Sequence, residues 1–326
     1  MTLTSIEICA GGGGQALGVE QAGFEHTLLV DNDPWAVKTL RHNRPAWNVL
    51  EEDLLKWDPT GLESPDLFAG GVPCPPFSQA GKQLGDADER NLFDKAIDFV
   101  EVLHPRAVML ENVRGLLSLK FTEYREHILN RLDAAGYTGE WKLLYAKDFG
   151  VPQLRPRAIL VALPHDLFSH FSWPTDTVEP ATVGETLVDL MAQRGWKGAR
   201  EWAKNADSIA PTVVGGSHKH GGADLGPSRA RAAWAEMGVK GTSLAEQAPD
   251  PDFVGNPRLT PRMLARIQGF PDDWEFIGKK TQQCRQIGNA FPPPVACAVA
   301  TQIHNCLLYT SPSPRDATLS RMPSSA

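Results

Sequence analysis

Short apolar runs alternate with amphipathic stretches through the first 165 residues of this chain. The apolar runs predict strands at residues 6–9, 27–30, 67–69, 107–110, 141–145 and 158–163. The amphipathic stretches predict helices at residues 15–22, 34–42, 92–103 and 124–135. Such alternation is typical of βαβ units, so the sequence predicts an α/β fold with a mostly parallel sheet.

Beyond Pro164 this alternation stops, and the chain becomes rich in Gly, Pro, Ser and Trp until helical periods return at 260–268 and 295–307. The change predicts a second, smaller and irregular domain. The expected boundaries are 1–171 for the first domain, 172–284 for the second, 285–307 for a helix that returns to the first, and 308–326 for a tail. The tail is rich in Ser and Pro, a composition that predicts disorder and is equally compatible with a non-native extension.

The composition is that of a globular protein, with 42% hydrophobic and 22% charged residues. No stretch approaches the roughly 18 apolar residues of a membrane span, and the first residues do not resemble a signal peptide. We therefore expect a cytoplasmic protein with no membrane partner. The five cysteines are scattered and lack metal-ligand spacing, so neither a disulfide framework nor a metal site is expected.

The net charge of −7 at first argues against a nucleic-acid partner, whose phosphates attract Lys and Arg. The charge is uneven, however. Residues 1–111 hold 8 Lys/Arg and 18 Asp/Glu, whereas residues 197–231 hold six Lys/Arg, three Asp/Glu and the histidines His218 and His220. On charge alone, this segment is equally compatible with a DNA-facing surface and with an ordinary solvated loop.

A run of four glycines, Gly11 to Gly14, follows the first predicted strand and opens the first predicted helix. Bare backbone and helix N–H groups at such a place bind nucleotide-type cofactors. Asp31 ends the next strand, where an acid commonly accepts hydrogen bonds from ribose hydroxyls. Asp53 is a candidate for the adenine amino group, with an ordinary surface acid as the alternative. The loop by itself does not separate a nicotinamide enzyme from a methyltransferase.

Cys74 lies in the segment Pro73-Cys74-Pro75-Pro76-Phe77-Ser78, directly after the predicted strand at 67–69. Three prolines restrict the backbone and hold the thiol at the carboxyl edge of the sheet, where open α/β folds bind ligands. Most free cysteines are small buried hydrophobic residues, which is our interpretation of Cys9 and Cys297. The context of Cys74 instead predicts a nucleophile.

Glu111 ends the next predicted strand in the sequence Glu111-Asn112-Val113. Parallel strands bring their carboxyl ends to one edge, so Glu111 is expected beside Cys74 as a proton donor, with an ion-paired or capping acid as the alternative. Arg155 and Arg157 precede the strand at 158–163 and bring two cations to the same region.

These segments, in this order, resemble the cytosine-5 DNA methyltransferase family. The cofactor motif is Ile8-Cys9-Ala10-Gly11-Gly12-Gly13-Gly14, with Cys9 in place of the usual Phe. The other five are the nucleophile motif at Pro73 to Ser78, the acid motif at Glu111 to Val113, the QxRxR motif at Gln153 to Arg157, the ninth motif at Arg258 to Pro271, and the last motif at Gln286 to Ala290. The resemblance spans residues 6 to 307 and leaves out only the intervening domain and the tail.

The resemblance implies methyl transfer from S-adenosylmethionine to C5 of a cytosine flipped out of double-stranded DNA, through a covalent bond between Cys74 and C6. The implied catalytic residues are Cys74, Glu111, Arg155 and Arg157. The implied cofactor-binding residues are Ile8, Cys9, Ala10, Gly11, Gly13, Gly14, Asp31, Asn32, Asp53, Leu54, Pro73, Asn289 and Ala290. The implied DNA-binding residues are Ser78, Lys82, Gln83, Lys219, Arg229 and Arg231. Residues 172–284, including the ninth motif, are then the target-recognition domain.

We expect this chain to be a monomer. Because members of this family often protect host DNA, a cognate restriction endonuclease that acts on the same site is a candidate partner. Three alternatives differ from this prediction. An RNA cytosine-5 methyltransferase would carry a Cys-Phe-Thr motif that this sequence lacks, and a nicotinamide oxidoreductase would not explain Pro73 to Ser78. A catalytically silent DNA-binding regulator would need neither Cys74 nor Glu111.

Overall fold

The computed structural model describes residues 2–73, 92–215 and 222–309. Its strands are β1 (Leu3–Ile8), β2 (Phe24–Asp31), β3 (Val49–Glu51), β4 (Leu67–Gly70), β5 (Ala107–Val113), β6 (Tyr137–Tyr145) and β7 (Pro156–Pro164). They form one sheet in the order β3-β2-β1-β4-β5-β7-β6. The pairs from β3 to β5 are parallel, whereas β7 is antiparallel to both β5 and β6. The prediction of an α/β fold with a mostly parallel sheet is therefore confirmed.

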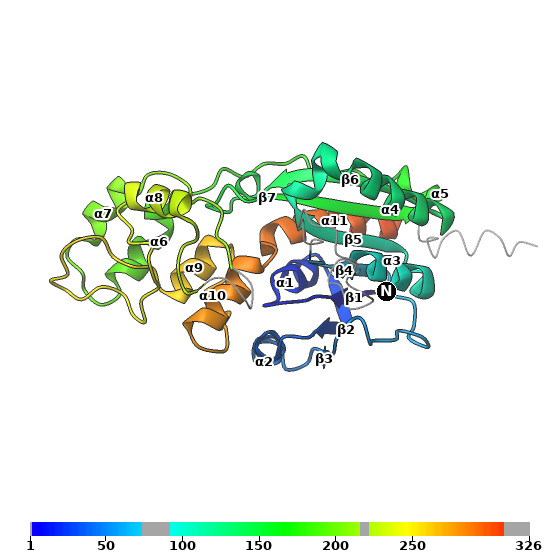
Figure 1. Ribbon diagram of the computed structural model, residues 1–326, viewed down its shortest axis with the longest axis horizontal. Helices are drawn as coiled ribbons and strands as arrows, with labels where there is room; N and C mark the ends of the chain where they lie inside the picture. Colours follow the sequence, from blue (N-terminus) through cyan, green and yellow to red (C-terminus); the bar gives the residue numbers. More distant parts are fainter. Residues whose placement is uncertain (1, 74–91, 216–221, 310–326) are drawn as a thin grey trace, which may run out of the picture.

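The helices of the first part alternate with these strands and cover both faces of the sheet (Figure 1). They are α1 (Gly14–Gln21), α2 (Pro34–Asn43), α3 (Leu92–Leu103), α4 (Thr122–Ala134) and α5 (His165–Phe168), with 3-10 turns η2 (Arg114–Leu117), η3 (Leu119–Phe121) and η4 (Ala146–Asp148). The six predicted strands and four predicted helices all form, with ends shifted by a few residues. The short edge strand β3 was not predicted.

Alternate residues of the central strands pack into two cores. Phe68, Val108 and Leu110 pack with α3 and α4 on one face. Leu67 and Ala69 pack on the other face with α11 (Pro293–Tyr309), which therefore returns to the sheet from the far end of the chain. Central strands are buried on both faces, and this explains why their sequences are continuous apolar runs.

The second part of the chain, expected to be irregular, consists of short helices joined by long stretches without regular structure. It contains α6 (Val183–Ala192), α7 (Ala199–Asn205), α8 (Ser228–Glu236), α9 (Pro261–Ile267) and the start of α10 (Lys280–Asn289), and no strand forms within its described residues. It lies at one end of the molecule, on the left of Figure 1. The N-terminus of α6 is fixed by a capping box in which Thr182 and Glu185 bond to each other's backbone N–H groups.

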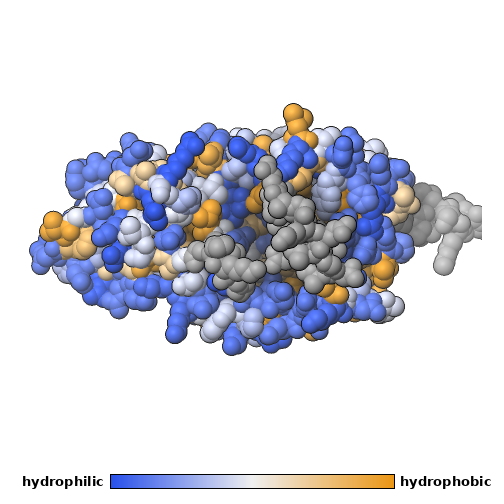
Figure 2. Space-filling view, viewed as in Figure 1, coloured by the Kyte–Doolittle hydropathy of each residue, from blue (hydrophilic) through white to orange (hydrophobic). Residues whose placement is uncertain are grey.

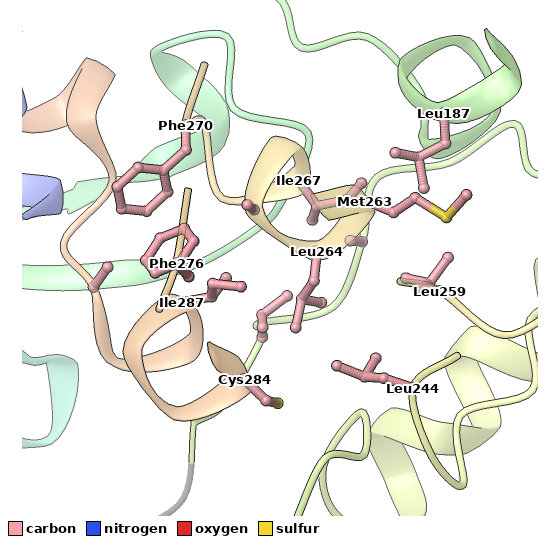
Figure 3. Close-up of a cluster of buried hydrophobic side chains, with 14 of the residues drawn as sticks. Leu187, Leu244, Leu259, Met263, Leu264, Ile267, Phe270, Phe276, Cys284 and Ile287 are labelled. Atoms are coloured by element: carbon pink, nitrogen blue, oxygen red, sulfur yellow. The ribbon is translucent and has the colours of Figure 1, made fainter. Parts of the chain in front are cut away.

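A third hydrophobic core joins the two parts. It includes Leu187, Leu259 and Met263 from the second part, and Leu17 and Leu40 from helices α1 and α2 of the first. Figure 3 shows the stretch of this core between α6, α9 and α10, where Phe270 and Phe276 approach the first part. The second part is consequently packed onto the glycine-loop side of the sheet by apolar contact.

Candidate active site

The glycine loop connects β1 to α1 and is held in place by Asp31. One carboxylate oxygen of Asp31 accepts the backbone N–H of Gly11 at 2.7 Å, and the other accepts that of Asp33 at 2.8 Å. Gly11 and Gly13 have φ angles of 53° and 87°, which only glycine adopts without strain. Burial raises the pKa of the Asp31 carboxyl, while hydrogen bonds from the backbone of Asp33, Gly11 and Asn32 act in the opposite direction. Asp31 therefore fixes the loop to the neighbouring β2–α2 turn.

A cavity of about 410 Å³ opens beside this loop, at the carboxyl ends of β1, β2, β4 and β5 and the end of α10. Ten of the predicted site residues line it: Cys9, Ala10, Gly11, Gly14, Asp31, Asn32, Pro73, Glu111, Asn289 and Ala290. The sequence motifs thus converge on one cavity, although they lie up to 281 positions apart (Cys9 to Ala290). This is the edge where parallel α/β sheets bind their ligands.

Four predicted cofactor residues do not line the cavity. Ile8 and Leu54 are buried in the core beneath α3. The Asp53 carboxylate accepts the backbone N–H of Leu55 and so stabilises its own turn. A Cβ on Gly13 would lie 2.5 Å from the Trp274 ring, which packs against the back of the loop.

Several cavity residues were not among the predicted ones, notably Gln15, Asp33 and Gln286. The side-chain oxygens of Gln15 and Gln286 are buried and accept no hydrogen bond from the described part of the chain. Buried acceptors of this kind normally have a donor, so a ligand that carries N–H or O–H groups would fit here. Asp33 had a readable signal, because it is the N-cap before Pro34 at the start of α2.

Glu111 and Arg157 meet at the end of β5. Arg157 pairs with Val113 in the β5–β7 ladder, and its Nε lies 2.5 Å from Oε1 of Glu111. The same carboxylate borders Gly71, since a Cβ added there would lie 3.5 Å from its Oε2. Asn112 donates to the backbone carbonyl of Val72 at 3.1 Å. The acid therefore stands beside the chain that leads to Pro73. Cys74 itself lies outside the described residues.

Cys9 is the other cysteine of this region, and it lines the cavity with φ at 50°. Burial, followed by the nearby charges of Asp31 and Glu7, raises the pKa of its thiol well above the ordinary value. The thiolate is the nucleophilic form of cysteine, so Cys9 is unsuited to nucleophilic attack.

Arg155 does not line the cavity. Its side chain is fully buried, and its guanidinium donates to the carbonyls of Val213, Gly288 and Ala290 at 2.6 to 2.8 Å. Burial, and then the charge of Arg157, lower the pKa of this guanidinium. The arginine joins the second part of the chain to the cavity wall at Ala290, which is a structural contact rather than one with the reacting groups.

Two of the six predicted DNA-binding residues belong to the part of the chain that the structure describes. Ser78, Lys82, Gln83 and Lys219 lie outside the described residues. Arg229 and Arg231 are on α8, where Arg229 is exposed and the Arg231 guanidinium lies 3.4 Å from the Ser228 hydroxyl. In Figure 1, α8 lies in the second part of the chain, away from the sheet.

The surface drawn in Figure 2 is largely hydrophilic with scattered apolar residues. Along residues 2–73, 92–215 and 222–309, no helix is both long and apolar enough to span a membrane. Over the same ranges no three His, Cys, Asp or Glu side chains are grouped as metal ligands would be.

Comparison with known proteins identifies the family. Residues 3–305 match the family model described as C-5 cytosine-specific DNA methylase. The chain is 55% identical to the Type II methyltransferase M.NaeI of Lentzea aerocolonigenes, over 94% of this chain and 76% of that protein. It is 53% identical to the Type II methyltransferase M.NgoMIV of Neisseria gonorrhoeae, over 94% of this chain and 99% of that protein.

Among solved structures, that of the S. pombe Dnmt2 methyltransferase has the same fold, with a TM-score of 0.65 at 18% identity, covering 94% of this chain and 99% of that one. The family match decides between the enzyme classes that the glycine loop alone left open. The chain belongs to the C-5 cytosine-specific DNA methylase family and is a DNA cytosine-5 methyltransferase.

Proposed function

We propose that the cavity beside the glycine loop binds S-adenosylmethionine and that Cys74 is the nucleophile. The observation that carries this proposal is the position of Glu111, which lies in the wall of the same cavity as Gly11 and Asp31. An acid at that point can contact a base on one side while the glycine loop contacts the cofactor on the other. When bound, S-adenosylmethionine would supply a methyl group from its sulfonium.

The fit of the cavity to this cofactor rests on its polar groups. The carboxylates of Asp31 and Asp33 suit ribose hydroxyls, and the buried oxygens of Gln15 and Gln286 suit amino groups. The N-terminus of α1 begins at Gly14 in the cavity wall and favours a carboxylate. These groups together match the donors and acceptors of an amino-acid nucleoside.

The protein residues carry the remaining chemistry. The Cys74 thiolate adds to C6 of the flipped cytosine while Glu111 hydrogen bonds to N3 and protonates it, which makes C5 nucleophilic. After C5 has been methylated, a base removes the C5 proton, N3 loses its proton and the thiolate leaves from C6, which restores the aromatic ring. We assign two roles to Arg157: it orients Glu111 through their ion pair, and it contacts the base carbonyl when the cytosine is bound.

We assign DNA reading to the second part of the chain, residues 172–284. The catalytic motifs lie elsewhere, and contacts to base edges are what distinguish one site from another. Lys219, Arg229 and Arg231 there, and Ser78, Lys82 and Gln83 after the nucleophile, are the proposed DNA contacts. The names of the two relatives support a role as the modification enzyme of a Type II restriction–modification system with a cognate endonuclease.

Bisulfite sequencing of DNA from cells that express the protein tests the proposal. We expect one short sequence to become methylated at a single cytosine, and no methylation with Cys74→Ala at equal protein level. A methylated site that persists in Cys74→Ala would overturn the assignment of the nucleophile. DNA carrying the mark should also resist an endonuclease that cuts the same sequence.

A further inference from the structure

The segment Trp274 to Ile277 belongs to the second part of the chain and lies against the back of the glycine loop. The Trp274 indole N–H donates to the carbonyl of Gly12 at 3.0 Å, and its side chain is 5% exposed. A Cβ on Gly12 would lie 2.7 Å from the Phe276 ring, just as one on Gly13 would lie 2.5 Å from the Trp274 ring. Positions 12 and 13 therefore require glycine, because aromatic rings from a distant segment occupy the space that a Cβ would need.

Helix α2 fixes the backbone of this segment. The Asn43 side chain accepts the N–H of Glu275 and donates to its carbonyl, both at 2.8 Å. The Thr39 hydroxyl accepts the N–H of Ile277 at 2.9 Å. Because its main chain is bonded on both sides of Phe276, the segment cannot shift without breaking hydrogen bonds, and the Trp274 ring has a defined position.

Helix α10, on the other wall of the cavity, is bonded to the same segment. Gln283 and Gln286 donate to the carbonyls of Phe276 and Ile277 at 2.8 and 2.9 Å. Gln286 also lines the cavity. The segment thus joins the wall made by the glycine loop to the wall made by α10, and Figure 3 shows Phe276 beside the α10 residue Ile287.

We propose that Trp274 is a positioning residue for the cofactor: by fixing the Gly12 carbonyl it sets the orientation of the loop that receives S-adenosylmethionine. The second part of the chain then determines cofactor affinity as well as DNA contact. This inference rests on the proposed cofactor site. Trp274 does not line the cavity itself, so its effect is on binding rather than on the reacting atoms.

Trp274→Phe tests this inference, because it removes the indole N–H and keeps an aromatic ring. Trp196→Phe is a matched control: Trp196 is 7% exposed, its indole N–H also donates to a backbone carbonyl, that of Phe253 at 2.9 Å, and neither residue lines the cavity. The measurements are the dissociation constant of S-adenosylmethionine by calorimetry, the melting temperature, and kcat and KM for methyl transfer to DNA.

We expect Trp274→Phe to weaken cofactor binding about fivefold, the usual effect of one hydrogen bond. KM for S-adenosylmethionine should rise in proportion, with kcat at saturating cofactor unchanged. Both variants should lower the melting temperature by a similar amount, because each loses one buried indole hydrogen bond. Trp196→Phe should leave the dissociation constant of S-adenosylmethionine at the parental value.

Unchanged affinity in Trp274→Phe, or an equal loss in both variants, would overturn the inference, since the tryptophan would then act on general stability alone. A fall in kcat with unchanged affinity would do the same. If the parent protein failed to bind S-adenosylmethionine, the proposed cofactor site would fall and this inference with it.

Discussion

Arg157 Nε lies 2.5 Å from Oε1 of Glu111, across the antiparallel pair formed by β7 and β5. Both residues are buried, with 9% of Arg157 and 7% of Glu111 exposed. The pair is diagonal in the ladder, because Arg157 is opposite Val113, whose side chain projects from the same face as that of Glu111. The reversal of β7 therefore brings a fixed cation to an acid at the cavity wall.

Glu111→Gln should lower kcat about 100-fold or more, because general acid catalysis typically contributes that much and an amide delivers no proton. Affinity for S-adenosylmethionine should stay near the parental value. Single-turnover methyl transfer and calorimetry measure the two quantities. Glu101→Gln is the control, since Glu101 also forms an ion pair with an arginine, Arg131, but lies on α3 outside the cavity. A kcat within threefold of the parent would remove Glu111 from the mechanism.

Asp31→Asn should weaken S-adenosylmethionine binding about ten- to hundredfold, since a hydrogen bond to a charged group contributes roughly 1.5 to 3 kcal/mol. The amide cannot accept from both Gly11 and Asp33. The control is Asp66→Asn, because Asp66 also accepts a backbone N–H, that of Thr4 at 2.8 Å, at the opposite edge of the sheet. Asp66→Asn should lower the melting temperature and leave the affinity for S-adenosylmethionine unchanged. Equal affinity in both variants would contradict the role given to Asp31.

The sequence predicted the strands and helices that contribute apolar runs to the core. It missed short elements that have no such run. Strand β3 has only three residues, too few for a periodic pattern. Helix α7 has only seven residues, and its N-cap residue, Gly198, has no side chain that could signal the start of a helix. Helix α6 was readable in principle, since Thr182 and Glu185 have capping-box spacing before an apolar stretch.

The site likewise contains residues that the sequence predicted and contacts that it could not show. Residues at strand ends, such as Asp31 and Glu111, were predicted because parallel strands end at one edge. The sequence could not show that Gly12 and Gly13 accommodate Phe276 and Trp274, because that packing joins positions more than 260 residues apart. Nor could it show that the Arg155 guanidinium bonds to backbone carbonyls and does not line the cavity.

Arg155→Met should lower the free energy of unfolding by about 2 kcal/mol or more, because each buried acceptor left unsatisfied costs roughly 1 to 3 kcal/mol. Three carbonyls lose their donor in this variant. Arg200→Met on the exposed face of α7 is the control and should melt like the parent. Thermal and urea unfolding measure the difference. Parental stability with lost catalysis would restore Arg155 to a direct catalytic role.

Glu7 should make stability depend on pH. Its side chain is buried, and a hydrogen bond with the backbone of Ala16 in α1 offsets the effect of burial only in part. Burial, and then the charge of Asp31, raise its pKa well above 4.5. The folded state then binds a proton more tightly than the unfolded state, so this stabilisation is complete below about pH 4.5 and is lost as pH rises through the folded pKa.

Glu7→Gln removes that titration. Its melting temperature relative to the parent should therefore increase from pH 5 towards pH 8, and it is measured in parallel scans at constant ionic strength. Glu25→Gln, on an exposed position of β2, should follow the parent at every pH. A difference between Glu7→Gln and the parent that stays constant with pH would show that the carboxyl does not titrate in this range.

The covalent step provides the last prediction, and it distinguishes Cys74 from Cys9 as the nucleophile. A duplex with 5-fluorocytosine at the methylated position should accept Cys74 at C6 and a methyl group at C5. Fluorine cannot leave as a proton does, so the thiolate is not expelled and the protein stays bonded to the DNA. The complex should survive denaturing electrophoresis and form only when S-adenosylmethionine is present.

Cys74→Ala should abolish this complex. Cys9→Ala should still form it at saturating cofactor, because burial and the charges of Asp31 and Glu7 keep the Cys9 sulfur protonated and therefore poorly nucleophilic. Loss of the complex in Cys9→Ala alone, with binding of S-adenosylmethionine intact, would transfer the nucleophile from the proline-rich loop to the glycine loop. Loss of the complex in both variants, with cofactor binding intact, would show that formation of the covalent bond requires both sulfurs.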